Sequence, residues 1–132
     1  MPLITYDFKI PAATPKTAPK RDQIRVPAGI LRRIWILIPP GHRALAHMVI
    51  KHGETQIIPH EGVIHGDSEL LVVDEYYEFK TEDVITLEGW NDDPYYYHTF
   101  YLRFLILPPL LAAPELELTK GLRVMLEAMG VL

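Results

Sequence analysis

Residues 30–41 carry the sequence Ile-Leu-Arg-Arg-Ile-Trp-Ile-Leu-Ile-Pro-Pro-Gly, a β-rich run with an abrupt stop. Isoleucine, leucine and tryptophan over nine residues favour a strand, because β-branched and aromatic side chains fit a pleated surface. Proline cannot donate a ladder hydrogen bond, so Pro39 and Pro40 end the run. The stretch therefore predicts a strand over residues 30–38 that ends in a turn.

Short apolar runs closed by proline or glycine recur on both sides of this stretch. The prolines between Asp22 and Pro109 all fall between such runs, where no ladder hydrogen bond is needed. Seven or eight strands at this spacing predict an all-β fold, an antiparallel β-sandwich or jelly roll, over residues 22–108. The expected strands are 23–26, 30–38, 44–51, 55–58, 69–73, 84–90 and 96–107.

Two further segments flank the predicted sandwich. In residues 1–21, an alternating strand places Tyr6, Phe8 and Ile10 on one side and leads into a proline-rich connector. Such a connector is extended, so we expect residues 1–21 to form an arm that reaches a neighbouring subunit. A strand that completes its own sheet is the alternative. In residues 109–132, apolar residues including Leu122 and Met125 recur at helical spacing and predict a short amphipathic helix.

The composition predicts one soluble domain without disulfides. A chain of 132 residues without cysteine has enough length for a hydrophobic core, and no run is long and apolar enough to span a bilayer. Few asparagines and glutamines with abundant proline favour a thermophilic source.

Charge is distributed unevenly along the chain. Residues 1–33 carry seven bases and two acids, whereas residues 54–93 carry twelve acids and one base. This split predicts that the N-terminal segment lies against an acidic surface, its own or a neighbour's. An acidic body is a poor partner for nucleic acid.

Two predicted strands are apolar on both sides. In residues 30–38, Ile34 and Ile36 lie on one side while Leu31, Trp35 and Leu37 lie on the other. Residues 96–107 also carry apolar side chains on both sides. A free sandwich has polar outer faces. We therefore expect the outer side to be covered by the C-terminal helix, the N-terminal strand or another subunit.

No catalytic or metal motif is recognisable. The histidines His52, His60 and His65, with Glu61 and Asp67, lack the spacing of known metal sites. Acids that could bind calcium or form a glycosidase pair lie outside any calcium-loop pattern. The only serine, Ser68, stands between two carboxylates that disfavour an oxyanion. We expect no enzyme and no cofactor. The acids considered are Asp74, Glu75, Glu78, Asp92 and Asp93.

Aromatic residues form the remaining candidate site. Trp90 and Tyr95–Tyr97 flank an acidic turn, and aromatic platforms beside carboxylates suit either a sugar or a protein interface. Because neighbouring side chains of a strand alternate, three successive tyrosines cannot all face one core.

Turn and strand-edge motifs between residues 22 and 108 support a comparison with a known class. They are Val26-Pro27-Ala28-Gly29, Ile38-Pro39-Pro40-Gly41, Gln56-Ile57-Ile58-Pro59, Gly66-Asp67, Asp74-Glu75-Tyr76-Tyr77-Glu78 and Gly89-Trp90-Asn91-Asp92-Asp93. Their succession resembles small sandwich proteins of tailed bacteriophages, such as capsid decoration proteins. The resemblance implies a virion component assembled in the host cytoplasm.

These observations together predict a non-enzymatic structural protein that forms homo-oligomers and binds other virion or capsid proteins. A carbohydrate-binding sandwich is the alternative. We expect no membrane or nucleic-acid partner. The residues expected at the assembly interface are Tyr6, Phe8, Ile10, Trp35, Tyr95, Tyr96, Leu122 and Met125.

Overall fold

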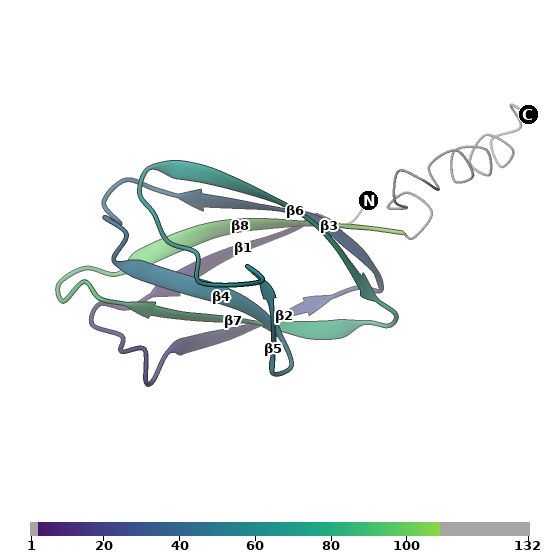
Figure 1. Cartoon of the computed structure of the whole chain (residues 1–132), viewed down its shortest axis with the longest axis horizontal. Helices are drawn as coiled ribbons and strands as arrows, with labels where there is room; N and C mark the ends of the chain where they lie inside the picture. Colours follow the sequence, from purple (N-terminus) through teal and green to yellow (C-terminus); the bar gives the residue numbers. More distant parts are fainter. Residues whose placement is uncertain (1–2, 109–132) are drawn as a thin grey trace, which may run out of the picture.

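The computed structural model describes residues 3–108, which fold into eight antiparallel strands in two packed sheets (Figure 1). The predicted sandwich is therefore confirmed. The predicted C-terminal helix, with Leu122 and Met125, lies outside the described residues, and within them no helix is long and apolar enough to cross a membrane. The strands are β1 (Leu3–Ile10), β2 (Lys20–Val26), β3 (Gly29–Ile38), β4 (Ala46–His52), β5 (Thr55–Ile58), β6 (Glu69–Phe79), β7 (Asp83–Asn91) and β8 (His98–Leu107).

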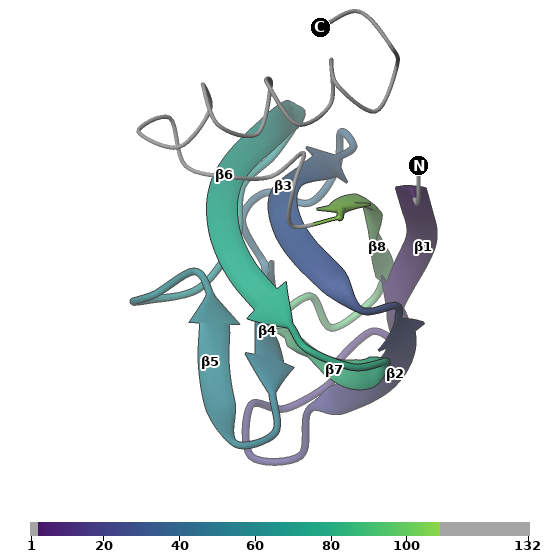
Figure 2. The ribbon, with the colours of Figure 1, turned by 90° about the vertical axis from the view of Figure 1, so that its right-hand side faces the viewer.

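Each sheet contains four strands. Sheet A has the order β1-β8-β3-β6, and sheet B has the order β2-β7-β4-β5. Figure 2 shows the two sheets as separate layers. The chain crosses between the layers at every connection except the β4–β5 hairpin. The tight β3–β4 turn and the β7–β8 loop therefore lie at the same end of the sandwich, since Leu37 near the end of β3 pairs with Tyr101 near the start of β8.

The core fills the space between the two sheets with side chains from alternating strand positions. In β8, Phe100, Leu102 and Phe104 are fully buried while Tyr101 and Arg103 are exposed. This alternation follows from the period of two of an extended chain. Sheet B contributes Met48, Ile50 and Leu87 from the other side.

A bulge in β3 changes the predicted orientation of one residue. The pairing register shifts between Leu31 and Arg33: β3 contains one extra residue there relative to β8, and β6 contains one extra residue relative to β3. Leu31 consequently joins the core with Ile34, and does not lie on the outer side with Trp35 as strict alternation predicted. A bulge cannot be recognised from alternation alone, because either phase of residues 30–38 is apolar.

The N-terminal strand belongs to its own domain, in contrast to the expected arm. All eight residues of β1 pair with β8 of the same chain, from Leu3 opposite Leu105 to Ile10 opposite His98. Phe8 and Ile10 are fully buried in the core. These two side chains are therefore not on an exposed surface, because the home sheet supplies the apolar partner that they require.

The proline-rich connector also lies on its own domain. The Ala13 amide donates to the Asp93 carbonyl at 2.8 Å, and the Asn91 amide donates to the Thr14 carbonyl at 2.9 Å. Lys16 Nζ lies 5.2 Å from the centroid of the Trp90 ring. The connector thus follows the end of β7 instead of extending away from the sandwich.

The oppositely charged segments of the sequence form ion pairs within the chain. Bases from the first 33 residues pair with acids from the acidic stretch, as the prediction of an acidic surface allowed. The pairs are Arg21–Glu88 at 3.0 Å, Arg25–Glu82 at 2.9 Å and Arg33–Asp74 at 2.6 Å. Such exposed pairs each contribute about 0–1 kcal/mol, so their main effect is to orient neighbouring strands.

Candidate assembly and binding surfaces

The outer face of sheet A carries an apolar patch. We call it the sheet A face and define it by six side chains that point away from the core. Four of them, Leu3, Leu37, Leu70 and Val72, are aliphatic, and Leu70 is 56% exposed. The complete set is Leu3, Trp35, Leu37, Leu70, Val72 and Tyr101.

The strand register places these side chains in adjacent rows. Leu37 on β3 lies between Tyr101 on β8 and Leu70 on β6. Trp35, two residues earlier, lies between Arg103 and Val72. Because residues opposite each other in a sheet are about 5 Å apart, the rows form one continuous patch. A shallow hollow of about 590 Å³ lies over its β1, β8 and β3 part.

The charges on the sheet A face balance. Arg33 and Asp74 form an ion pair at 2.6 Å, and the Arg33 guanidinium lies 5.8 Å from the centroid of the Trp35 ring. Arg103 on the inner strand β8, beside Trp35, and Asp7 on the edge strand β1 add one further charge of each sign. These four charges around the sheet A face sum to zero, whereas the whole chain has a net charge of −4.

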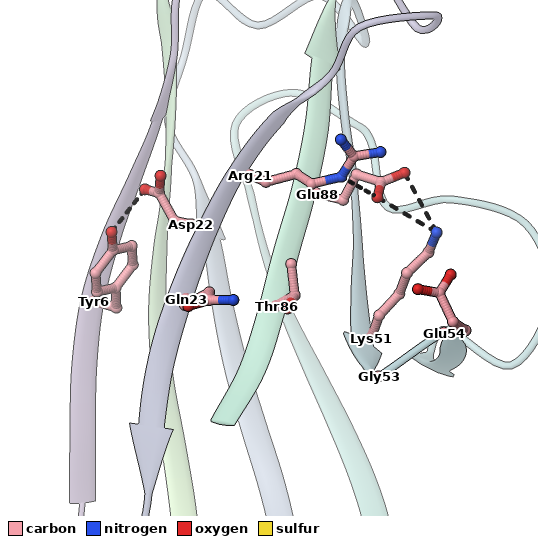
Figure 3. A pocket seen from close by; sticks show the side chains of 9 residues that line it. All are labelled: Tyr6, Arg21, Asp22, Gln23, Lys51, Gly53, Glu54, Thr86 and Glu88. Carbon is pink, nitrogen blue, oxygen red and sulfur yellow. Dashed lines mark hydrogen bonds and ion pairs between the residues drawn. The ribbon is translucent and has the colours of Figure 1, made fainter. Parts of the chain in front are cut away.

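The outer face of sheet B is polar by contrast. Figure 3 shows a pocket in which Arg21 and Lys51 both contact the Glu88 carboxylate. Burial raises the pKa of Glu88, but the hydrogen bond from Arg21 and the charge of Lys51 outweigh it and hold that pKa below its usual range. Arg21, Lys51 and Glu88 thus compensate each other's charges in this pocket.

Tyr6 closes the side of the same pocket. Its hydroxyl donates to the Asp22 carboxylate at 2.6 Å and so joins β1 to β2 across the two sheets (Figure 3). The hydrogen bond to Asp22, burial and the negative charge of Asp22 raise the pKa of Tyr6 to about 12. Tyr6 therefore links the two sheets and does not lie on the sheet A face.

Trp90 is not part of an exposed aromatic platform. It is 9% exposed, and its ring stacks on that of His47 at 5.3 Å between centroids. His65 packs on His47 in turn, at 5.2 Å. The sequence pattern could not separate Trp90 from the tyrosines, because its covering residues come from distant segments.

The β7–β8 loop presents three exposed tyrosines. We call residues 92–97 the tyrosine loop. Tyr95, Tyr96 and Tyr97 are 81%, 69% and 58% exposed. Lys9 Nζ lies 4.0 Å from the centroid of the Tyr97 ring, so one face of that ring is covered by β1. As predicted, successive tyrosines do not all enter one core.

A buried carboxylate holds the tyrosine loop in place. Asp93 Oδ1 accepts hydrogen bonds from the amides of Tyr95 and Tyr96 at 2.9 and 3.2 Å. Asp93 Oδ2 accepts from His98 Nε2 at 2.8 Å. The hydrogen bond from the Tyr95 amide, together with His98 and the Tyr96 amide, outweighs burial and lowers the pKa of Asp93. The loop is therefore fixed without support from the tyrosine rings.

His42 lies buried beneath this loop. Its Nε2 donates to the Thr99 carbonyl at 2.9 Å, and its ring lies 4.7 Å from that of His98. His42 Nδ1 has no hydrogen-bond partner among the described residues. Burial lowers the pKa of His42, and the neighbouring His98 lowers it further, against the opposing effects of Thr99 and Asp67.

This arrangement predicts a loss of stability on mild acidification. An unfolded histidine titrates near pH 6.5. Because the folded pKa of His42 is lower, the unfolded state binds more protons as the pH falls below about 6.5, and stability decreases. We expect the melting temperature to drop by a few degrees between pH 7 and pH 5, at about 4–8 °C for each kcal/mol lost. In the His42→Gln variant, which keeps a donor for Thr99, this drop should become smaller. An equal drop in both proteins would refute the role of His42.

The residues considered for metal or acid chemistry do not converge. His52 contacts Tyr77 at 2.6 Å and Asp83 at 2.7 Å, whereas His60 pairs with Glu75 at 2.9 Å. Among residues 3–108, no group of three histidine, cysteine or acidic residues has the arrangement of a metal site. Three further acids have separate partners: Asp67 accepts from the Gly41 amide, Asp74 pairs with Arg33, and Asp92 pairs with His47.

The predicted interface residues are therefore dispersed. Trp35 lies on the sheet A face, and Tyr95 and Tyr96 lie on the tyrosine loop at the end of the same sheet. Sequence reasoning missed Leu70 and Val72 as surface residues. The sequence did indicate an apolar outer side, because the run Glu69-Leu-Leu-Val-Val73 places apolar residues on both sides of a strand, as residues 30–38 do.

No protein-family model matches the chain, and a search of curated proteins finds no significant match. The strand topology places the described residues in the class of antiparallel β-sandwiches with two four-stranded sheets.

Proposed function

We propose that the protein is a non-enzymatic structural subunit of a virus particle and that it assembles through the sheet A face. One observation carries this proposal: the face exposes Leu37, Leu70 and Val72 on adjacent strands of a well-formed sheet. Soluble monomers rarely expose a contiguous apolar patch of this kind, and large patches mark sites of association.

A second copy of the chain is the occupant that fits the face best. The face carries no net charge, so two copies meet there without the repulsion that their net charge of −4 produces elsewhere. Four strands about 4.8 Å apart and about seven residues long present roughly 450 Å². Two such faces bury about 900 Å², which is below the roughly 1,200–2,000 Å² of a stable isolated interface.

An interface of this size suits a subunit of a larger assembly. Several weak contacts in one particle reinforce each other through effective concentration. The strand orders β1-β8-β3-β6 and β2-β7-β4-β5 further support the proposal, since they are those of a jelly roll, an architecture found in viral capsid domains and in lectins. The resemblance of the turn motifs to bacteriophage decoration proteins points the same way.

The test is a charge placed on the face. In the Leu70→Lys/Val72→Lys variant, each copy would bury two ammonium groups without partners at the interface, so we expect the oligomer to dissociate at concentrations where the wild type is assembled. Light scattering after size exclusion measures the mass. The matched control is Gln23→Lys on the exposed side of sheet B, which should leave the mass unchanged.

Other occupants of the face give different outcomes. If residues 109–132 of the same chain cover it, the wild type is a monomer, and the double lysine variant loses stability without a change of mass. If only a different virion protein binds there, the wild type is again a monomer and the variant keeps its melting temperature. Either result contradicts self-assembly through the sheet A face.

A further inference from the structure

A second surface lies at the end of the sandwich where the tyrosine loop meets the β3–β4 turn. Pro39, Pro40 and Arg43 of the turn and Tyr95–Tyr97 of the loop surround a hollow of about 660 Å³. This volume is within the range of small-molecule sites. The tyrosine rings are the most exposed large apolar groups among the described residues.

The exposed rings have no part in packing the sandwich. The hydrogen bonds of Asp93 and the bond from Asn91 Nδ2 to the Tyr96 carbonyl at 2.9 Å fix the loop through its backbone. A rigid loop that presents aromatic rings has already lost the conformational entropy that binding would otherwise remove. This is the arrangement of a preformed recognition site.

The opposite wall is conformationally strained. Arg43 and Ala44 both have positive φ, at 50° and 56°. Such backbone is uncommon for residues other than glycine, asparagine and aspartate, and it clusters at functional sites. The turn holds the exposed Arg43 at the rim of the hollow, and no ion pair joins it to the other described residues.

We propose that this hollow binds the pyranose rings of a neutral oligosaccharide. Tyrosine is amphipathic, so its ring face packs against the C–H face of a sugar while its hydroxyl reaches the sugar hydroxyls. Arg43 supplies further donors in a planar fork. The ligand needs no positive charge, because the one buried acid of the site, Asp93, already pairs with His98. Tyr95 and Tyr96 carry the stacking, since Lys9 covers one face of Tyr97.

The test is a titration of the ¹⁵N-labelled full chain with cellotetraose and maltotetraose, which differ in linkage geometry. We expect at least one of them to shift the amide signals of residues 92–98 with a dissociation constant near or below about 1 mM. The Tyr95→Ala and Tyr96→Ala variants should each bind at least about tenfold more weakly, with melting temperatures close to that of the wild type. Arg43→Asn, which tolerates positive φ, should also weaken binding.

The matched control is Tyr76→Ala, an exposed tyrosine on β6 away from the hollow, which should leave the affinity unchanged. The proposal is overturned if neither sugar shifts the loop signals at about 10 mM. It is also overturned if the shifts persist in Tyr95→Ala and Tyr96→Ala, or if the loop signals respond only to protein concentration, because a second copy of the chain would then occupy the hollow. The hollow shares Tyr101 with the sheet A face, but the residues varied in this test lie outside that face.

Discussion

Replacement of Phe8 by alanine is expected to lower the free energy of unfolding by about 3–5 kcal/mol, the range for a large aromatic residue removed from a packed core. Phe8 is fully buried on β1 and contacts the core between the sheets. β1 is an edge strand whose only partner in the sheet is β8, so the loss of one of its two fully buried side chains also weakens its pairing. Since small domains have a total stability of about 5–15 kcal/mol, the variant should lie close to the limit of folding.

Urea denaturation followed by circular dichroism measures this effect. Thr5→Ala is the matched control, because Thr5 is on the same strand but exposed, and it should change stability by less than about 0.5 kcal/mol. If the Phe8→Ala variant instead keeps its stability and only dissociates from an oligomer to a monomer, β1 pairs with a neighbouring subunit. That result would support the N-terminal arm that the sequence predicted.

A single methyl group at Gly89 is expected to have the second largest effect. A Cβ there would lie 2.5 Å from Ile10 Cδ1, 2.8 Å from Phe8 Cε2 and 2.9 Å from the His47 carbonyl oxygen. The carbonyl belongs to the neighbouring strand and cannot move aside without breaking the ladder. We therefore expect Gly89→Ala to destabilise the protein by about 1–3 kcal/mol, the usual cost of overpacking a core.

A double-mutant cycle separates the clash from a general effect of alanine. Phe8→Leu removes ring atoms next to Gly89, so part of the loss should be recovered in Gly89→Ala/Phe8→Leu relative to the sum of the single changes. Additive losses would show that β1 does not pack on Gly89 in solution.

Most strands could be predicted because their limits are local. Proline and glycine end β3 and β5 where the sequence indicates, and the expected 55–58 strand matches β5. β6 was predicted to end at Val73 but continues to Phe79. Its second half, Asp-Glu-Tyr-Tyr-Glu-Phe, contains acids and aromatic residues without regular alternation and lacks the aliphatic signal of the first half.

Long-range features could not be read from the sequence. The partner of β1 depends on which sheet edge is free, and the bulge after Leu31 depends on the register with two neighbours. The apolar outer face was predictable from the two-sided pattern around Trp35. Its extension onto Leu70 and Val72 required the order of the strands, which places β6 beside β3.

Sedimentation velocity of the full chain between about 1 and 200 µM tests the central claim most directly, since this range brackets the affinities of weak interfaces. If the sheet A face binds a second copy, the sedimenting mass will rise with concentration from 15.1 kDa to a multiple of it, and the Leu70→Lys/Val72→Lys variant will stay at 15.1 kDa throughout. A wild-type chain that remains at 15.1 kDa over the whole range would contradict the claim.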